Sequence, residues 1–247
     1  ECLAEYKKQN QIYLGTGASP TYINLCTTPL RSLEDLKGKK YRSGAANFGR
    51  WAEHFGGIKV SIPGNDIYEA MDQGVIDCAM LSATELTNLS LFDLTKFVVR
   101  RIPGGVFSGV ATINVNRDSW QDLTTAERKV FLQGAARINA DLTWKYYSDA
   151  KKNIDASPAK GIEVIEPGPE IMKASGEFVK GDVKIIAAQF TKDYGLKNVD
   201  PKIAKITELI EKWKGLTADI ADDPEALTKL YWDEIFSKID PATFGMK

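Results

Sequence analysis

The residues able to do chemistry are few, and their spacing matches no familiar catalytic or metal-binding pattern. The chain of 247 residues has one histidine, His54, which excludes a multi-histidine metal site and a histidine acid–base pair. Its three cysteines, Cys2, Cys26 and Cys78, lack the CxxC spacing of zinc and thioredoxin-like sites. No dinucleotide fingerprint, phosphate loop or nucleophile elbow is present, and residues 15–17 form only a loose glycine turn. We therefore expect no metal, no cofactor and no enzyme active site.

Composition restricts the partners. The chain is 43% hydrophobic and 26% charged, with a net charge of −1, which is typical of a globular protein. A surface that binds nucleic acid normally needs a strongly basic face, so we expect no nucleic-acid partner. No apolar run approaches the roughly 18 residues of a transmembrane helix. No signal peptide is recognisable either, which fits a mature or truncated product.

The first half of the chain alternates short apolar strands with short helices. This order predicts parallel strands joined by crossovers, and in such sheets ligands bind beyond the carboxyl ends of the strands. Arg42, Leu81 and Ser82 fall at such ends. The strands are predicted at residues 12–14, 22–26, 40–43, 59–62, 75–81, 98–101, 110–115 and 162–165.

The second half is predicted to be helical. A T-x-x-E capping box, Thr124 to Glu127, begins a pattern that continues to about residue 153, or ~40 Å at 1.5 Å per residue. Such a helix is longer than one small lobe needs, so we expect it to brace two. Three further helices are predicted at residues 170–194, 201–214 and 224–238. In the first half, Ser32 and Asp35 form another capping box, and Asn65 or Asp66 is expected to cap a helix.

Four segments in a fixed order resemble one protein family. SLEDLKGKKYR at 32–42 is followed by VSIP at 60–63, DIYEA at 66–70 and GVID at 74–77. This set is similar to the "sLeDLKGlKiR … p … EvYtAL … GvvD" pattern of TRAP-type (DctP-family) periplasmic solute-binding proteins. The resemblance implies an α/β, two-lobed periplasmic-binding-protein-like fold, with a long helix bridging the lobes and a helical C-terminal tail.

The same resemblance implies a domain organisation. Residues 1–19 and 107–146 would belong to the first lobe, and residues 20–106 and 147–195 to the second. Residues 196–247 would be C-terminal helices that pack on the lobes. Family members begin with a βα-rich part of the first lobe that has no counterpart here. We therefore expect the N-terminal part of that lobe to be missing from this chain.

Arg42 is the strongest candidate for a ligand contact. The resemblance places it where the family holds the ligand carboxylate with an arginine. The chemistry suits this role, because a guanidinium offers a planar fork that matches a carboxylate with two hydrogen bonds and stays charged when desolvated. Without the motif around it, Arg42 would be interpreted as a surface arginine at a strand end.

Several other residues are weaker candidates, and each has a structural interpretation beside the functional one. Tyr22 and Leu81 stand where sialic-acid binders of the family carry an arginine and an asparagine, which implies a smaller or more apolar ligand. Trp51 lies on an apolar helical stripe and is either core or an aromatic wall of the cleft. The remaining candidates are Asn65, Ser82, Glu85, Phe107 and Ser108. Asp77 is interpreted as structural and His54 as exposed.

The cysteines suggest a disulfide without fixing it. A periplasmic protein can keep a disulfide, and a bridge between Cys2 and Cys26 is considered. Cys78, in a predicted buried strand, is interpreted as a small hydrophobic residue. Spacing alone leaves the pairing open.

The leading hypothesis is a periplasmic solute-binding protein of a TRAP transporter. It would bind a small organic acid through Arg42, deliver it to the TRAP membrane permease subunits by transient contact, and act as a monomer. Monocarboxylates, hydroxy acids, C4-dicarboxylates and aromatic acids all fit. The alternatives are an α/β enzyme acting on a small organic acid, weakened by the absence of a nucleophile–base pair, and a periplasmic ligand sensor.

Overall fold

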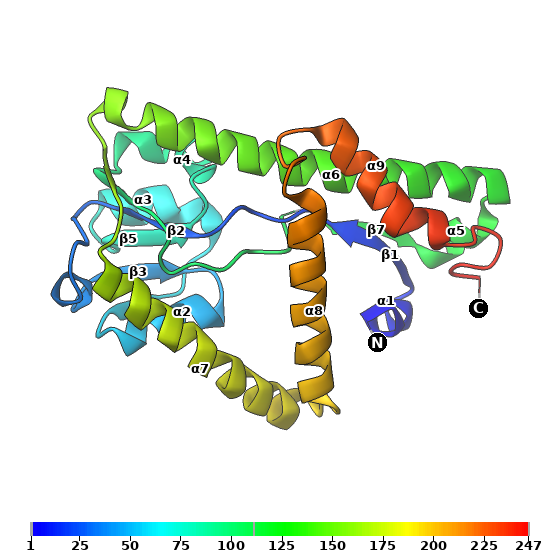
Figure 1. Ribbon diagram of the computed structural model, residues 1–247, viewed down its shortest axis with the longest axis horizontal. Coiled ribbons are helices and arrows are strands. Elements are labelled where there is room, and N and C mark those ends of the chain that lie inside the picture. The colour runs from blue at the N-terminus through cyan, green and yellow to red at the C-terminus, as the bar shows by residue number, and fades with distance from the viewer. Residues whose placement is uncertain (1, 111, 247) are drawn as a thin grey trace. The chain divides into compact units, whose positions relative to one another are not determined.

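The computed structural model describes residues 2–110 and 112–246, and the chain divides into two compact units (Figure 1). Unit 1 comprises Glu1–Ser19, Phe107–Ser148 and Glu211–Lys247. Unit 2 comprises Pro20–Val106 and Asp149–Ile210. The chain therefore passes from unit 1 into unit 2 and back twice.

Unit 2 is built on a mixed sheet in which the strand order is β4-β3-β5-β2-β6-β8. β3 is parallel to β4 and β5, and β6 is parallel to β8, but β2 is antiparallel to both of its neighbours. The prediction of a parallel sheet is therefore wrong for β2. The chain enters β2 from the edge at which β3 and β5 end, so β2 runs in the opposite direction. The strands are β2 (Ile23–Cys26), β3 (Lys40–Ser43), β4 (Ile58–Val60), β5 (Cys78–Leu81), β6 (Phe97–Val99) and β8 (Glu163–Ile165).

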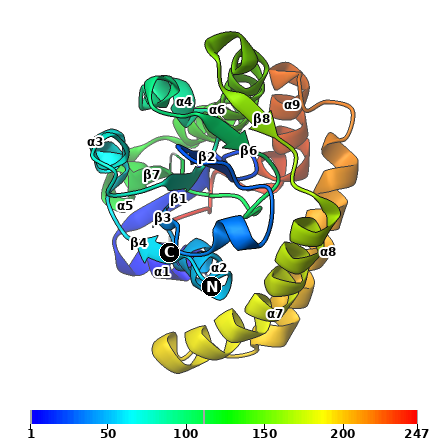
Figure 2. The ribbon, with the colours of Figure 1, turned by 90° about the vertical axis from the view of Figure 1, so that its left-hand side faces the viewer.

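Helices cover both faces of this sheet, as Figure 2 shows from the side. One face packs on α3 (Ile67–Asp72), α4 (Glu85–Asn88) and the last turns of α6. The other face packs on α2 (Ala46–His54) and the start of α7 (Pro169–Tyr194). Because both faces are covered, every residue of β2 and β5 is buried.

Local capping explains some of the helix starts. Ser32 and Asp35 form the predicted reciprocal cap: the Asp35 carboxylate accepts from the Ser32 amide at 2.9 Å, and the Asp35 amide donates to the Ser32 hydroxyl at 3.3 Å. The element they cap is only a 3₁₀ turn, Glu34–Leu36. Asp66 stands at the N-cap of α3, but its side chain makes no capping hydrogen bond, so the predicted capping role is not seen.

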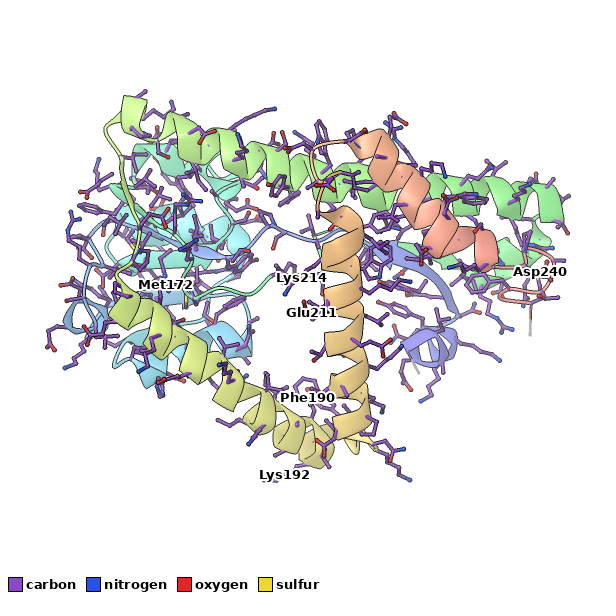
Figure 3. The ribbon with its side chains drawn as sticks, viewed as in Figure 1. Met172, Phe190, Lys192, Glu211, Lys214 and Asp240 are labelled. Carbon is purple, nitrogen blue, oxygen red and sulfur yellow. A yellow bond between two sulfur atoms is a disulfide. The ribbon has the colours of Figure 1, made fainter. Side chains whose placement is uncertain are left out.

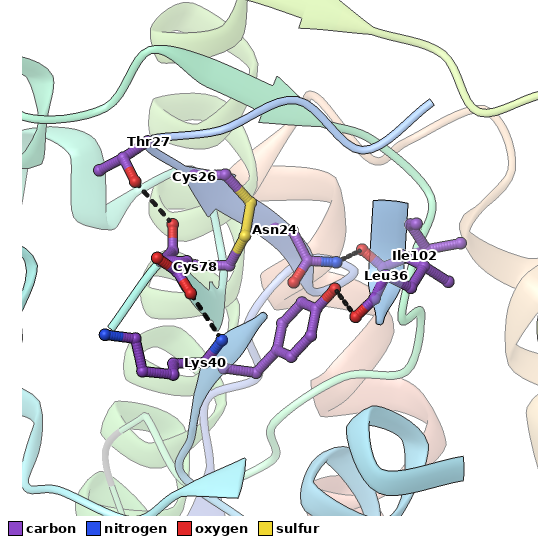
Figure 4. Close-up of a disulfide and its surroundings, with 9 residues drawn as sticks. Asn24, Cys26, Thr27, Leu36, Lys40, Cys78 and Ile102 are labelled. Atoms are coloured by element: carbon purple, nitrogen blue, oxygen red, sulfur yellow. Dashed lines mark hydrogen bonds between the residues drawn. A yellow bond between two sulfur atoms is a disulfide. The ribbon is translucent and has the colours of Figure 1, made fainter. Parts of the chain in front are cut away.

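The cysteine pairing differs from the prediction. Cys26 on β2 lies opposite Cys78 on β5, with 4.1 Å between their Cα atoms, and the two form a disulfide (Figure 4). A Cys2–Cys26 bridge is therefore wrong, as is the interpretation of Cys78 as a free hydrophobic residue; the side chain of Cys2 lies outside the described residues. Strand register decides the pairing, and spacing along the chain does not reveal register.

Asp77, beside this disulfide, has the structural role expected of it. Its carboxylate accepts from the Lys40 amide at 2.8 Å, and its carbonyl oxygen accepts from the Thr27 amide at 2.9 Å. Both bonds fix the ends of neighbouring strands.

Unit 1 contains a two-stranded antiparallel sheet of β1 (Gln11–Thr16) and β7 (Thr112–Asn116). β1 follows α1 (Cys2–Lys8), and β7 leads into α5 (Arg117–Asp122), whose first amides are capped by the Asn116 side chain. Residues Ile12, Leu14, Trp120, Leu132 and Phe236 form its core. A largely apolar cavity of about 360 Å³ lies in this unit, lined by Leu3, Tyr13, Leu14, Gly15, Thr16, Asn139, Tyr231, Ile235, Phe236, Ile239 and Phe244.

The predicted long helix is α6 (Thr125–Ala156), 32 residues or ~48 Å in length. Its capping box forms as expected, since Glu127 accepts from the Thr124 amide at 2.7 Å and the Glu127 amide donates to the Thr124 hydroxyl at 3.3 Å. Residues 125–148 belong to unit 1 and residues 149–156 to unit 2, so the helix contributes to both.

The C-terminal part is helical, as predicted, with α7, α8 (Val199–Thr217) and α9 (Pro224–Glu234), followed by a 3₁₀ turn at Phe236–Lys238. The last turns of α7 are exposed and carry Phe190 and Lys192 (Figure 3). On α8, Glu211 and Lys214 form an exposed ion pair at 2.7 Å (Figure 3). Across residues 2–110 and 112–246, no helix combines the length and apolar character needed to cross a membrane.

Candidate ligand-binding site

Three neighbouring strands bring the main candidates to one edge of the unit 2 sheet. On the parallel strands β3 and β5, Ser43 lies opposite Met80. On the antiparallel strand β2, Ile23 lies opposite Leu81. Gly44 after β3, Ser82 after β5 and Tyr22 before β2 therefore meet at the same edge. The register joins residues that are up to 60 positions apart in the sequence.

Arg42 provides the main charge at this edge. The side chain is held in place, because Nε donates to the Ile62 carbonyl oxygen at 3.3 Å and only 9% of the residue is exposed. Its guanidinium lies against Gly44. A Cβ added to this glycine would be only 2.9 Å from Nη1 and 3.1 Å from Nη2 of Arg42, which is too close for any residue other than glycine unless the side chain moves. Within residues 2–110 and 112–246, neither Nη atom has a hydrogen-bond or ion-pair partner. The arrangement leaves the forked end of a buried guanidinium able to bind an anion.

Glu85 and Arg42 influence each other's pKa. Burial lowers the pKa of Arg42, and the nearby Tyr22 and Glu85 offset this effect in part. Burial also raises the pKa of Glu85, against the opposing influence of a hydrogen bond from Asn88 and the charge of Arg42. No ion pair joins Arg42 and Glu85 in the part of the chain that the structure describes.

Ser82 is the second polar group at this edge. The residue is 1% exposed, and its hydroxyl has no hydrogen-bond partner among the described residues. An unsatisfied buried hydroxyl costs about 1–3 kcal/mol, so a polar ligand atom within reach would be stabilising. Leu81, by contrast, is 3% exposed and packs in the hydrophobic core beneath the sheet. It contributes to the core and offers no polar contact.

Tyr22 is held by both its backbone and its ring. Its amide donates to the Gly105 carbonyl oxygen at 2.8 Å, and its ring stacks on Phe48 with 4.7 Å between centroids. Phe48 lies in the first turn of α2, which has Ala45 at its N-cap and no side-chain cap. The open amides of a helix N-terminus favour anions, so this turn adds positive potential close to Arg42.

Trp51 is not part of this group. It is 1% exposed, its indole Nε1 donates to the Ser175 hydroxyl at 2.9 Å, and its ring packs on Tyr41 and Phe55. These contacts join α2 to α7 inside the core. The structural interpretation of its apolar stripe therefore accounts for every contact of Trp51.

The other predicted residues lie at the surface. Asn65 is exposed in the 3₁₀ turn Gly64–Asp66. Phe107 is 41% exposed and Ser108 is also exposed, and both belong to unit 1, where the Phe107 amide donates to the Ser19 hydroxyl at 2.9 Å. His54 is exposed, as expected. Strand register thus brings Arg42, Tyr22 and Ser82 to the same edge of the sheet, and Glu85 follows Ser82 by three residues at the start of α4.

Sequence reasoning missed Gly44 and Phe48. A glycine two residues after the strand-end arginine is the one available signal for Gly44, and it becomes meaningful only when the guanidinium is seen to lie against it. Phe48 lies on the same apolar helical stripe as Trp51, which gives no sign of a site. Its stacking on Tyr22 depends on where α2 begins relative to β2.

Comparison with known proteins agrees with this architecture. A helix-covered mixed sheet within a two-unit α/β chain is the architecture of periplasmic-type solute-binding proteins. The model of the family described as "Bacterial extracellular solute-binding protein, family 7" (DctP) matches residues 1–189. The chain belongs to this family.

The relatives are distant and longer than this chain. A solute-binding protein of Albidiferax ferrireducens is 26% identical over 170 residues, which cover 69% of this chain and 48% of that protein. The chain thus spans about half the length of this curated relative.

Solved structures share the fold. A TRAP periplasmic solute-binding protein of Desulfovibrio salexigens with bound orotic acid has a TM-score of 0.67 at 15% identity, covering 87% of this chain and 65% of its own. DctP7 of Bordetella pertussis, a receptor binding pyroglutamic acid, has a TM-score of 0.65 at 17% identity, covering 78% and 62%. A TRAP protein of Rhodoferax ferrireducens with bound malonate has a TM-score of 0.64 at 18% identity, covering 95% and 66%. The expected α/β fold of TRAP solute-binding proteins is confirmed.

Proposed function

We propose that this chain is the extracytoplasmic solute-binding component of a TRAP-type transporter and that it binds a small organic acid through Arg42. The observation that carries the proposal is the buried guanidinium at the edge of three strands, with both Nη atoms unpaired among the described residues. A carboxylate would accept hydrogen bonds from both Nη atoms. The ligands of the similar solved proteins, orotic acid, pyroglutamic acid and malonate, are all acids and support the same ligand class.

Three features around Arg42 support anion binding. The uncapped first turn of α2 favours negative charge, the Ser82 hydroxyl can donate a hydrogen bond, and Tyr22 lies at the same strand edge. The bound acid would replace the water that Arg42 and Ser82 lose on burial. No nucleophile or general base is needed for this role, so the ligand would leave chemically unchanged.

The remaining parts of the proposal follow from family membership. The chain divides after Ser19 and after Val106, which supports the proposal that units 1 and 2 are the two lobes of such a protein. Ligand contacts made to both lobes would drive closure, because a ligand shifts a conformational equilibrium only through differential contacts. The carrier would act in the periplasm and pass its ligand to the membrane permease subunits. The buried Cys26–Cys78 disulfide supports an oxidising compartment.

The test is to replace Arg42. Arg42→Ala should weaken binding of organic acids about 30-fold or more, since truncating one partner of a buried charge pair costs about 2–5 kcal/mol. Arg42→Lys should also bind poorly, because an ammonium lacks the fork. Isothermal titration calorimetry with a panel of organic acids measures both effects. Arg31→Ala, which changes an exposed arginine paired with Glu163, is the matched control and should bind as wild type. Unchanged affinity in Arg42→Ala would overturn the proposal.

A further inference from the structure

The turn that carries Ser82 is short and buried. β5 ends at Leu81, and α4, which begins at Glu85, is only four residues long. Ser82, Ala83 and Thr84, which connect the two elements, are each 1–2% exposed. A helix of this length is not stable by itself, because its few hydrogen bonds do not offset the ordering of its backbone. The position of the Ser82 hydroxyl therefore depends on contacts from outside the turn.

Asn153, near the C-terminal end of α6, provides such contacts. Its side-chain amide nitrogen donates to the Ala83 carbonyl oxygen at 2.9 Å and to the Thr84 carbonyl oxygen at 3.3 Å. Its side-chain oxygen accepts from the hydroxyl of Thr87 on α4 at 2.8 Å. Asn153 is 8% exposed, and these three bonds use both of its side-chain N–H groups and its oxygen. One buried side chain thus bonds both the turn and the helix that follows it.

The bonds from Asn153 differ in kind from the others made by these carbonyl groups. The Leu86 amide donates to the Ala83 carbonyl oxygen, and the Thr87 amide donates to the Thr84 carbonyl oxygen, both at 3.2 Å. Those bonds lie within the turn and its helix, so they shape the segment without fixing where it stands. Asn153 attaches the segment to α6, a separate element whose residues belong to both units of the chain.

We propose that Asn153 is a positioning residue of the ligand site, and that it keeps the Ser82 hydroxyl where it can donate to an acid bound by Arg42. This inference rests on the proposed function and adds to it a residue that acts through Ser82. A hydrogen bond between oxygens needs a donor–acceptor distance of about 2.5–3.0 Å, so a shift of the turn by about 1 Å removes it. The precision of this contact would therefore depend on the anchor on α6.

The experiment combines Asn153→Ala with Ser82→Ala in a double-mutant cycle. Calorimetry measures the affinity of wild type, both single variants and the double variant for orotate, pyroglutamate, malonate and lactate. Asn139→Ala is the matched control, because Asn139 is also a buried asparagine of α6 and is 6% exposed. Its side-chain nitrogen likewise donates to two backbone carbonyl oxygens, those of Leu14 at 3.0 Å and Ala135 at 2.8 Å, but in unit 1.

For the tightest-binding of these acids, Asn153→Ala should weaken binding about tenfold and Ser82→Ala about three- to tenfold. The double variant should bind within about twofold of Asn153→Ala, because the second substitution removes a hydroxyl that is already displaced. Asn139→Ala should lose similar stability in urea unfolding but keep its affinity within about twofold of wild type. A role of Asn153 in stability alone would produce neither the non-additive loss nor this difference between the two asparagines.

Amide hydrogen exchange of the ligand-free chain gives a readout that does not depend on binding. In Asn153→Ala, the amides of residues 85–88 should exchange at least tenfold faster, whereas those of α2 should be unchanged. Thr87→Val removes one of the three bonds and keeps the test decisive if Asn153→Ala does not fold. It should weaken binding about two- to threefold, and this effect should disappear in a Ser82→Ala background.

The outcomes separate this inference from the proposed function. Wild-type affinity in Asn153→Ala, additive losses in the double variant, or an equal loss in Asn139→Ala would overturn the positioning role while Arg42-dependent binding stands. Unchanged exchange at residues 85–88 would overturn the anchor itself, whatever the binding result. If none of the acids binds, or binding is indifferent to Arg42→Ala, the proposed function fails and the role of Asn153 in binding fails with it.

Discussion

Replacing Cys26 and Cys78 together by alanine removes the covalent link between β2 and β5, the two fully buried strands of unit 2. The bridge joins residues separated by 52 positions, so breaking it releases a long loop in the unfolded chain. Both cysteines are completely buried, which means that the effect on the folded state is confined to a small change in packing. The cost should therefore come mainly from the increased conformational entropy of the unfolded state.

The size of that cost follows from the loop length. For a loop of about 50 residues, the chain-entropy relation gives about 4 kcal/mol at 25 °C. In a protein of this size, each 1 kcal/mol changes the Tm by about 2–4 °C, so unit 2 should unfold roughly 8–16 °C lower. Reduced wild type should match the double variant, because both lack the same bond.

Urea unfolding followed by circular dichroism measures this difference, with thermal scans as the second readout. Cys2→Ala is the control and should lie within about 0.5 kcal/mol of wild type, since Cys2 has no part in the Cys26–Cys78 bridge. A loss below about 1 kcal/mol in the double variant would refute the entropic reasoning. A destabilised Cys2→Ala variant would show that the first cysteine has a structural role of its own.

Three further results are expected. Arg50→Ala should destabilise the protein by about 3 kcal/mol in urea unfolding, because it leaves the Asp182 carboxylate, now paired to Arg50 at 2.6 and 2.9 Å, buried and unpaired. Gly44→Ala should weaken acid binding tenfold or more in calorimetry with little loss of stability, because the new Cβ displaces the flexible end of Arg42. Glu85→Gln should be more stable than wild type at pH 7, because burial raises the pKa of the Glu85 carboxyl in the folded state. The folded wild type therefore binds this proton more tightly than the unfolded chain does, and its stability rises as the pH falls through the raised pKa. The stability difference between Glu85→Gln and wild type should shrink over the same range.

Each of these has a matched control or a contrary outcome. Arg31→Ala breaks an exposed ion pair with Glu163 and should cost less than about 1 kcal/mol, so equal losses in the two arginine variants would contradict the burial argument. Gly134→Ala, in a helix with no atom near the added Cβ, should leave binding unchanged. For Glu85→Gln, a stability difference that grows toward acid pH would have the wrong sign.

Local patterns predicted the elements of this chain because their causes are local. The capping boxes at Ser32 and Thr124 form as expected, since donor and acceptor lie three residues apart in any chain that turns there. Arg42 was placed at a strand end by the residues around it, and it stands there. The predicted cap at Asp66 does not form, and α3 instead continues directly from the 3₁₀ turn Gly64–Asp66.

Contacts between distant segments could not be predicted from the sequence, because they depend on which strands become neighbours in the sheet. Alternating strands and helices predict crossovers but not that β2 inserts between β5 and β6 in the opposite direction. The same insertion places Cys26 opposite Cys78 and Tyr22 beside Ser82. Trp51 is an example from the helices: its stripe fits both a wall of a site and a core, and its burial and its hydrogen bond to Ser175 on α7 place it in the core.

The sequence by itself determined the family, the order of the elements and the arginine expected to bind an acid. Those are properties of short segments, whose side chains interact with their own neighbours along the chain. Only the tertiary structure decided the disulfide pairing and the contact between Gly44 and the Arg42 guanidinium. The disulfide pairing depends on strand register, which is fixed by burial of both faces of the sheet at once and cannot be read from any one segment.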